Sequence, residues 1–207
     1  RRDGATDEEW ETANADPPTG WTWDNQDSTV ANENGTRKSF LTLTKSNNAS
    51  AHSLIYKNVP ASPNKTYYAA IQWASDNDGS GNNCQVGLVL RNNTSGRLIV
   101  FVVAANPTPN FFVVRWTTST VFSAIAYQST IAPTCTISEY LILAITSDGT
   151  NLNFKYAPLH EGGEGNYVQI YTETISTFLT SFDSFGVTIL KNSGTTNRLF
   201  CDWIRVV

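Results

Sequence analysis

The stretch CQVGLVLRNNTSGRLIVFVVAA, residues 84–105, contains two apolar segments separated by a short polar one. Residues two apart in a strand point to the same side, so the first segment has an apolar face: Cys84, Val86, Leu88 and Leu90. The intervening NNTSG is typical of a hairpin turn. The second segment is apolar on both faces, which predicts a central strand or one covered on its second face. The stretch therefore predicts an antiparallel hairpin within a sheet.

Segments of similar length and period recur along the chain, each bounded by Gly, Asn, Pro, Asp or Ser. Examples are TYYAAIQWA from Thr66, FFVVRWTT from Phe111, YLILAIT from Tyr140 and LFCDWIRVV from Leu199. The SDGTN stretch from Ser147 predicts another hairpin turn. Residues 175–182 predict one helical turn capped by Ser176, and no long amphipathic helix is visible. This pattern predicts an all-β, two-sheet antiparallel sandwich, although periodicity alone leaves a closed barrel open.

Charge divides the 207-residue chain into two parts. Residues 1–16 carry six acidic and two basic residues, which is the whole net charge of -4, so the remainder is neutral. Residues 1–20 are therefore expected to form an acidic arm or linker, and residues 21–207 the sandwich. The boundary stretch PPTGWTWDNQ, residues 17–26, places Trp21 and Trp23 on one side of a strand. They could form a sugar-stacking surface, but closing the end of the core is the favoured interpretation.

Composition also restricts the partners and the cell compartment. The chain has no basic stripe, which argues against nucleic-acid binding, and no apolar run long enough to span a bilayer. An odd set of cysteines, Cys84, Cys135 and Cys201, predicts reduced thiols and assembly in a reducing cytosol, although a single disulfide with one cysteine left over stays open. The chain has no Met, so we expect a processed product or a piece of a longer polypeptide.

Catalytic patterns are not visible in the sequence. A glycosidase needs two carboxylates facing each other across a sugar, yet the acids of the body fall mostly in turns, and Asp202 in the last strand has no acidic partner at position 200 or 204. The segment LHEGGEG from Leu159 lacks the second His of a metalloprotease helix, and its glycines predict a loop. These absences predict that the chain is not an enzyme.

Two candidate binding sites remain. The segment SDNDGSGNNC from Ser75 contains Asp76, Asp78 and Asn82 among glycines, a pattern similar to an oxygen-rich calcium loop. The alternative is a long polar hairpin, and no other cofactor is indicated. Trp116, beside Arg115 and followed by two threonines, is the candidate for carbohydrate stacking, with burial in the core as the alternative.

The order of short motifs resembles a known module. PPTGWTWDNQ, RNNTSGRLIVFVV, VVRWTTSTVFSAIAY, YLILAITSDGTNLNFKYAP, NYVQIYTETISTFLTSFDSFGVTI and LFCDWIRVV are similar to segments of concanavalin-A-like jelly-roll modules in bacteriophage tail and fibre proteins. The resemblance covers residues 17–207. It implies a jelly-roll sandwich on a virion surface, assembled in the bacterial cytoplasm.

The resemblance leads to a ranked expectation about function. A structural component of a phage tail, fibre or capsid surface comes first, with other virion proteins and copies of itself as partners and host-surface glycans as candidate ligands. A stand-alone carbohydrate-binding module or lectin is the alternative. Paired acids of glucanases are absent, and no sugar-binding signature of the family is matched, so no ligand residue is carried over.

Overall fold

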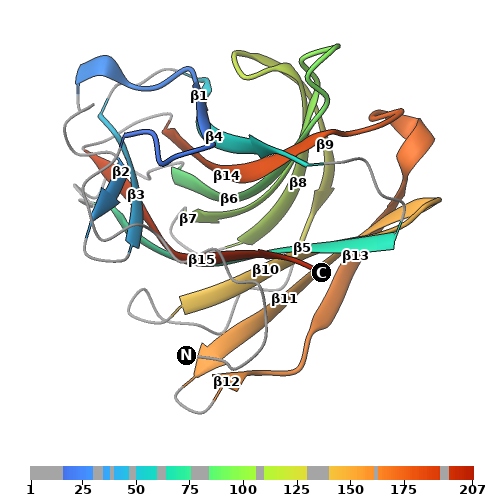
Figure 1. Cartoon of the computed structure of the whole chain (residues 1–207). Helices are drawn as coiled ribbons and strands as arrows, with labels where there is room; N and C mark the ends of the chain where they lie inside the picture. Colours follow the sequence, from blue (N-terminus) through green and yellow to red (C-terminus); the bar gives the residue numbers. More distant parts are fainter. Residues whose placement is uncertain are drawn as a thin grey trace.

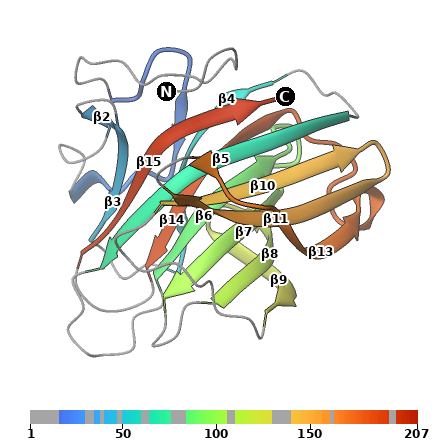
Figure 2. The same cartoon turned by 90° about the horizontal axis from the view of Figure 1, so that it is seen from below.

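The structure is a computed structural model that describes residues 16–29, 35–37, 40–46, 50–59, 64–75, 84–105, 110–129, 140–160, 163–191 and 196–207. Two antiparallel sheets are stacked on each other in Figure 1, and Figure 2 shows the larger one in front of the smaller. The predicted sandwich is confirmed, and the closed barrel is wrong. Of the predicted arm, only residues 16–20 lie within the described part.

The smaller sheet contains seven strands among the described residues, and all of its pairings are antiparallel. Their order across the sheet is β1 (Thr22–Asp24), β4 (His52–Asn58), β14 (Ser184–Lys191), β6 (Cys84–Arg91), β7 (Leu98–Ala105), β8 (Asn110–Thr118) and β9 (Val121–Gln128). The hairpin predicted from residues 84–105 is formed by β6 and β7, and both lie inside the sheet.

The larger sheet contains eight strands within the described ranges. Their order is β12 (Gly163–Glu164), β11 (Asn151–His160), β10 (Tyr140–Asp148), β5 (Asn64–Ser75), β15 (Asn197–Val206), β3 (Phe40–Lys45) and β2 (Gly35–Arg37), while β13 (Val168–Thr174) also pairs with β11. Of the segment LHEGGEG, predicted to be a loop, Leu159 and His160 end β11 and pair antiparallel with β12, while residues 161–162 lie outside the described part. The predicted helical turn is a 3-10 turn at Ile175–Thr177 with Thr174 at its N-cap, so the expected Ser176 cap is wrong.

Apolar side chains from the facing sides of both sheets form the main core. Phe101, Val187 and Ile71 are fully buried there. Trp21 is also buried in this core, where its ring lies 6.0 Å from that of Phe185. Trp23 packs against the same cluster and donates its indole N–H to Asp16. The core-closing interpretation of these two indoles is therefore confirmed.

The smaller sheet has a second apolar cluster on its outer face, the face turned away from the larger sheet. Its members are buried: Leu54, Val89, Leu98, Val100, Val102, Val114, Trp116 and Leu190. An antiparallel sandwich usually presents polar side chains on such a face. The outer face of the smaller sheet is thus partly enclosed by the protein itself.

Two glycines explain how this sheet bends toward its outer face. A Cβ atom at Gly87 would lie 2.0 Å from the carbonyl oxygen of Phe101, and one at Gly186 would lie 1.9 Å from that of Ile55. Glycine in a strand interior marks such close backbone approaches and tight bends. The bent sheet, visible in Figure 1, brings the turn between β8 and β9 to β4, where the His52 N–H donates to the carbonyl oxygen of Ser119 over 2.8 Å.

Candidate functional site

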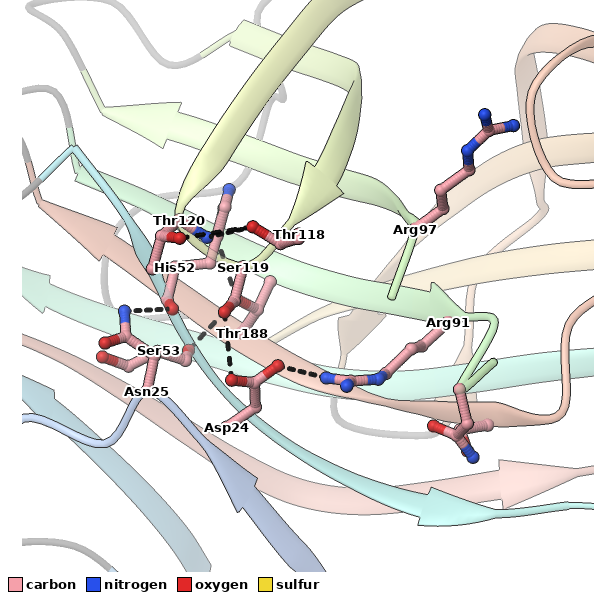
Figure 3. A network of polar contacts seen from close by, with 12 residues as sticks. Asp24, Asn25, His52, Ser53, Arg91, Arg97, Thr118, Ser119, Thr120 and Thr188 are labelled. Atoms are coloured by element: carbon pink, nitrogen blue, oxygen red, sulfur yellow. Dashed lines mark hydrogen bonds and ion pairs between the residues drawn. The ribbon is translucent and has the colours of Figure 1, made fainter. Parts of the chain in front are cut away.

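A network of polar contacts, which we call the polar bridge, joins β1, β4, β14 and β6 to the turn between β8 and β9. Its members are Asp24, His52, Arg91, Ser119 and Thr188 (Figure 3). β1, β4, β14 and β6 follow one another in the sheet, whereas β14, β6 and β7 separate β4 from β8, whose turn to β9 carries Ser119. The bend at the two glycines is what allows these residues to meet.

Asp24 is the centre of the polar bridge. Its Oδ1 accepts a hydrogen bond from the Ser119 hydroxyl over 3.0 Å, and its Oδ2 accepts one from the Arg91 guanidinium (Figure 3). The Arg91 guanidinium also lies over the Tyr56 ring, 4.7 Å from its centroid. The side chains of Asp24 and Arg91 are 27% and 15% exposed, so the ion pair keeps contact with solvent. A charged donor and acceptor are thus held in place at the surface.

His52 is the fully buried member of the polar bridge. The Thr188 hydroxyl donates to the carbonyl oxygen of Ser53, so it accepts from His52 Nδ1, which lies 2.9 Å away. This contact places the proton of the neutral ring on Nδ1. Burial, and secondly the charge of Lys45, lower the pKa of His52 to about 3. His52 is therefore a neutral structural group at physiological pH, and its Nε2 has no hydrogen-bond partner among the described residues.

Trp116 lies in the buried part of this region, with 4% of its surface exposed. Its ring meets that of His52 edge-on at 4.7 Å and that of Phe122 edge-on at 5.6 Å. In this position its ring has no open face for a sugar, and direct contact between Trp116 and carbohydrate stays a prediction. Phe122, on β9, is 53% exposed. The exposed aromatic surface of this region therefore belongs to Phe122, with Trp116 supporting it.

Exposed polar side chains flank the polar bridge. Asn25 adopts a left-handed backbone conformation with a φ of 55°, which Asn tolerates better than most residues, and its side-chain amide donates to the carbonyl oxygen of His52 over 2.9 Å. Thr118 and Thr120 are exposed on the β8–β9 turn, with their hydroxyls 3.2 Å apart. An exposed aromatic ring near several fixed donors and acceptors is chemistry suited to a ligand with an apolar face and many hydroxyls.

Sequence reasoning found only part of this region. Trp116 was a candidate, whereas Asp24, Arg91 and Ser119 were not, because 67 residues separate Asp24 from Arg91 and 95 separate it from Ser119. No local motif can reveal pairs so distant. The usable signal was the isolated glycine in each of the segments CQVGLVLR and SFGVTIL, which marks a bend or close approach.

The candidate calcium ligands Asp76, Asp78 and Asn82 lie outside the described residues, so calcium stays a prediction. Within the part of the chain that the structure describes, no three His, Cys, Asp or Glu side chains gather to hold a metal ion. Cys84 and Cys201 are buried free thiols, as expected, and Cys135 is not among the described residues. No helix in the described ranges has the length and apolar character needed to cross a membrane.

No protein-family model and no curated protein matches the chain, whereas many solved structures share its fold. A xylan β-1,4-xylosidase from Bacillus halodurans is 13% identical, with a TM-score of 0.60 over 82% of this chain and 33% of its own. The CBM2 module of the evolved Dit protein of Lactobacillus casei phage J-1 is 13% identical, with a TM-score of 0.55 over 96% and 97%. A legume lectin-like domain from Entamoeba histolytica is 10% identical, with a TM-score of 0.58 over 91% and 89%.

The hydrolase similarity corrects the expectation that the chain is not an enzyme. That expectation is wrong because glycoside hydrolases of the GH43 type are among the similar structures. The missing acid motif could not exclude an enzyme, because a fold can be shared when local motifs are not. The chain spans between 25% and 42% of the length of these hydrolase chains. At this level of identity the comparisons establish the fold: a concanavalin-A-like, jelly-roll β-sandwich of the lectin-like kind.

Proposed function

We propose that the chain binds carbohydrate at the surface formed by Phe122 and the polar bridge. The observation that carries this proposal is the exposed Phe122 ring, supported edge-on by Trp116, whose ring also meets His52 of the polar bridge. The fold supports it, since a lectin-like domain and a CBM2 module are built in the same way.

In this proposal each part of the surface has a separate role. The apolar face of a sugar ring stacks on Phe122, which excludes water from both surfaces. The exposed hydroxyls of Thr118 and Thr120 and the amide of Asn25 supply neutral hydrogen-bonding groups. Asp24 and Arg91 supply an acceptor and a donor whose positions are set before binding, which lowers the entropic cost of association.

We further propose that this domain is a component of a bacteriophage virion and attaches the virion to glycans of the host surface. The CBM2 module of the phage J-1 Dit protein supports this role, because the similarity covers nearly all of both chains. The sequence resemblance to tail and fibre modules points the same way. Self-association with other copies belongs to the same proposal. Light scattering is expected to show an oligomer, and a stable monomer at high concentration would contradict this part.

The binding proposal is tested with Phe122→Ala. Loss of the stacking ring is expected to weaken binding about tenfold, equivalent to about 1.4 kcal/mol. The assay is a glycan array carrying xylan, mucin and bacterial cell-wall oligosaccharides, followed by titration calorimetry on the best ligands. Val168→Ala is the matched control, because Val168 is also an exposed apolar residue, 44% exposed, but lies on β13.

Three results decide this test. Equal binding by wild type and Phe122→Ala would contradict the assignment of the site to this surface. The absence of binding to any glycan would contradict the proposed function itself. Release of reducing sugar from the array glycans is measured in parallel. If the wild-type chain released reducing sugar, the proposal of binding alone would be wrong and glycan hydrolysis would take its place.

A further inference from the structure

A β-bulge interrupts β15 in the middle of the larger sheet. Cys201 pairs with Ile71 and Trp203 pairs with Ala70, so Asp202 is the extra residue of the bulge, between two residues that face consecutive positions on β5. Bulges are enriched near functional sites because they redirect side chains. Here the bulge changes which residues face outward: Trp203 and Arg205 lie in register with Ala70 and Tyr68, on the face turned away from the smaller sheet.

This outer face of the larger sheet carries aromatic side chains around a small apolar centre. The buried centre consists of Ala70, Ile142 and Ala157, and partly buried residues pack against it: Tyr68, Tyr140, Leu159, Tyr167 and Trp203. The solvent face of an antiparallel sheet is normally polar. A cluster of four large aromatic side chains there indicates a surface with a purpose beyond covering the core.

The positively charged side chain of Arg205 is held among these rings. The Arg205 guanidinium lies 4.7 Å from the Tyr68 ring centroid and 4.8 Å from that of Trp203. The Tyr167 ring meets Tyr68 at 5.7 Å and 62°. Rings on two strands therefore hold one guanidinium in place. Because its side chain is already ordered in the free protein, binding a ligand loses less side-chain entropy.

Asp202, the bulge residue, is close enough to Tyr140 for its negative charge to act on the phenol. Burial raises the pKa of Tyr140, and the negative charge of Asp202 raises it further. The Phe40 ring stacks on Tyr140 with centroids 6.3 Å apart and 9° between their planes. This part of the face thus combines a carboxylate, a protonated phenol and apolar ring surface.

We propose that this aromatic face, defined by Tyr68, Tyr140, Tyr167, Asp202, Trp203 and Arg205, is a second carbohydrate-binding site. A sugar has an apolar ring face and hydroxyls that both donate and accept. The aromatic rings match the first property, and the carboxylate, phenol and guanidinium match the second. A purely apolar ligand would leave the two charged groups desolvated without new partners, which is unfavourable. The site lies on the opposite outer face of the sandwich from Phe122 and does not depend on it.

On the same glycan array, the test compares wild type, Phe122→Ala, Tyr167→Ala and the double variant that carries both substitutions. Tyr167 is chosen because it lies outside the strands, between β12 and β13, so its truncation spares the sheet. Asp202→Asn is a second variant of the same site with nearly unchanged volume. Thermal melts confirm that each variant is folded, and Val168→Ala is the control.

Some glycans are expected to bind Phe122→Ala normally but to bind Tyr167→Ala and Asp202→Asn at least tenfold more weakly. The double variant should bind none. The second site is overturned if Tyr167→Ala and Asp202→Asn bind like wild type, or if Phe122→Ala alone removes all binding. Loss of binding in Tyr167→Ala with no effect of Phe122→Ala would instead overturn the first site and keep the second.

Discussion

Replacing Gly87 or Gly186 with alanine is expected to lower the free energy of unfolding by about 3 kcal/mol. The new methyl group at either position would lie within 2.0 Å of a backbone carbonyl oxygen of the neighbouring strand. Backbone in the middle of a sheet cannot move aside as the end of a long side chain can. The strands must therefore separate or flatten, which also pulls the β8–β9 turn away from His52. Urea unfolding followed by circular dichroism measures the effect.

Two controls separate this clash from ordinary effects of substitution. Ser123→Ala, at an exposed position on β9, should change stability by less than about 0.5 kcal/mol. A Cβ atom at Gly96 would make only ordinary van der Waals contact, with its nearest neighbour at 3.7 Å, but the φ there is +74°, so Gly96→Ala should cost about 1–2 kcal/mol through backbone strain alone. If Gly87→Ala and Gly186→Ala were no more harmful than Gly96→Ala, close strand approach would not be what shapes the sheet.

Acidification from pH 7 to pH 5 is expected to lower the free energy of unfolding by about 2 kcal/mol through His52 alone. Its pKa is about 3 in the folded protein and 6.5 in the unfolded chain. Above pH 6.5 neither state binds the proton, so His52 adds no pH dependence. Between pH 6.5 and 3 the unfolded chain is protonated and the folded protein is not, which favours unfolding by about 1.4 kcal/mol per pH unit. Urea unfolding across this range measures the slope.

His52→Asn tests the assignment because its amide nitrogen can replace Nδ1 as donor to Thr188 without titrating. This variant should lose the slope between pH 6.5 and 5, where few carboxyl groups change charge. The chain has one other histidine, His160, so His160→Asn is the matched control and should keep the slope. A slope that survives His52→Asn would show that another group causes the acid sensitivity.

The strands could be predicted from the sequence because their information is local. Alternation in residues 84–90 and the run after Arg97 give β6 and β7 directly, and burial of Trp21 follows from its position at the start of a strand pattern. The sandwich and the antiparallel pairing follow from the number of such segments and their turns. The position of the N-cap at residue 174 rather than 176 could not be predicted as well, because the end of a helical turn can move by one or two residues at little cost in free energy.

The candidate site could not be predicted because its information is distributed. The polar bridge depends on a bend at Gly87 and Gly186, which lie in adjacent strands but far apart in the chain. Trp116 and Phe122 look alike in sequence, each in an alternating apolar strand, yet the bend buries the first and exposes the second. On the other face, a one-residue bulge decides that Trp203 points outward, and alternation counted through Asp202 would give a different register.

The position of β14 and β15 has a consequence for how the protein is made. Each is an interior strand of its sheet, β14 between β4 and β6 and β15 between β5 and β3, although both come from residues after 183. When synthesis has reached residue 180 of this chain, each of the two sheets therefore still lacks one interior strand. Contacts of such large sequence separation slow folding, and the unpaired strand edges favour aggregation until β14 and β15 have been synthesised. Efficient production thus depends on protecting the nascent chain until β14 and β15 emerge.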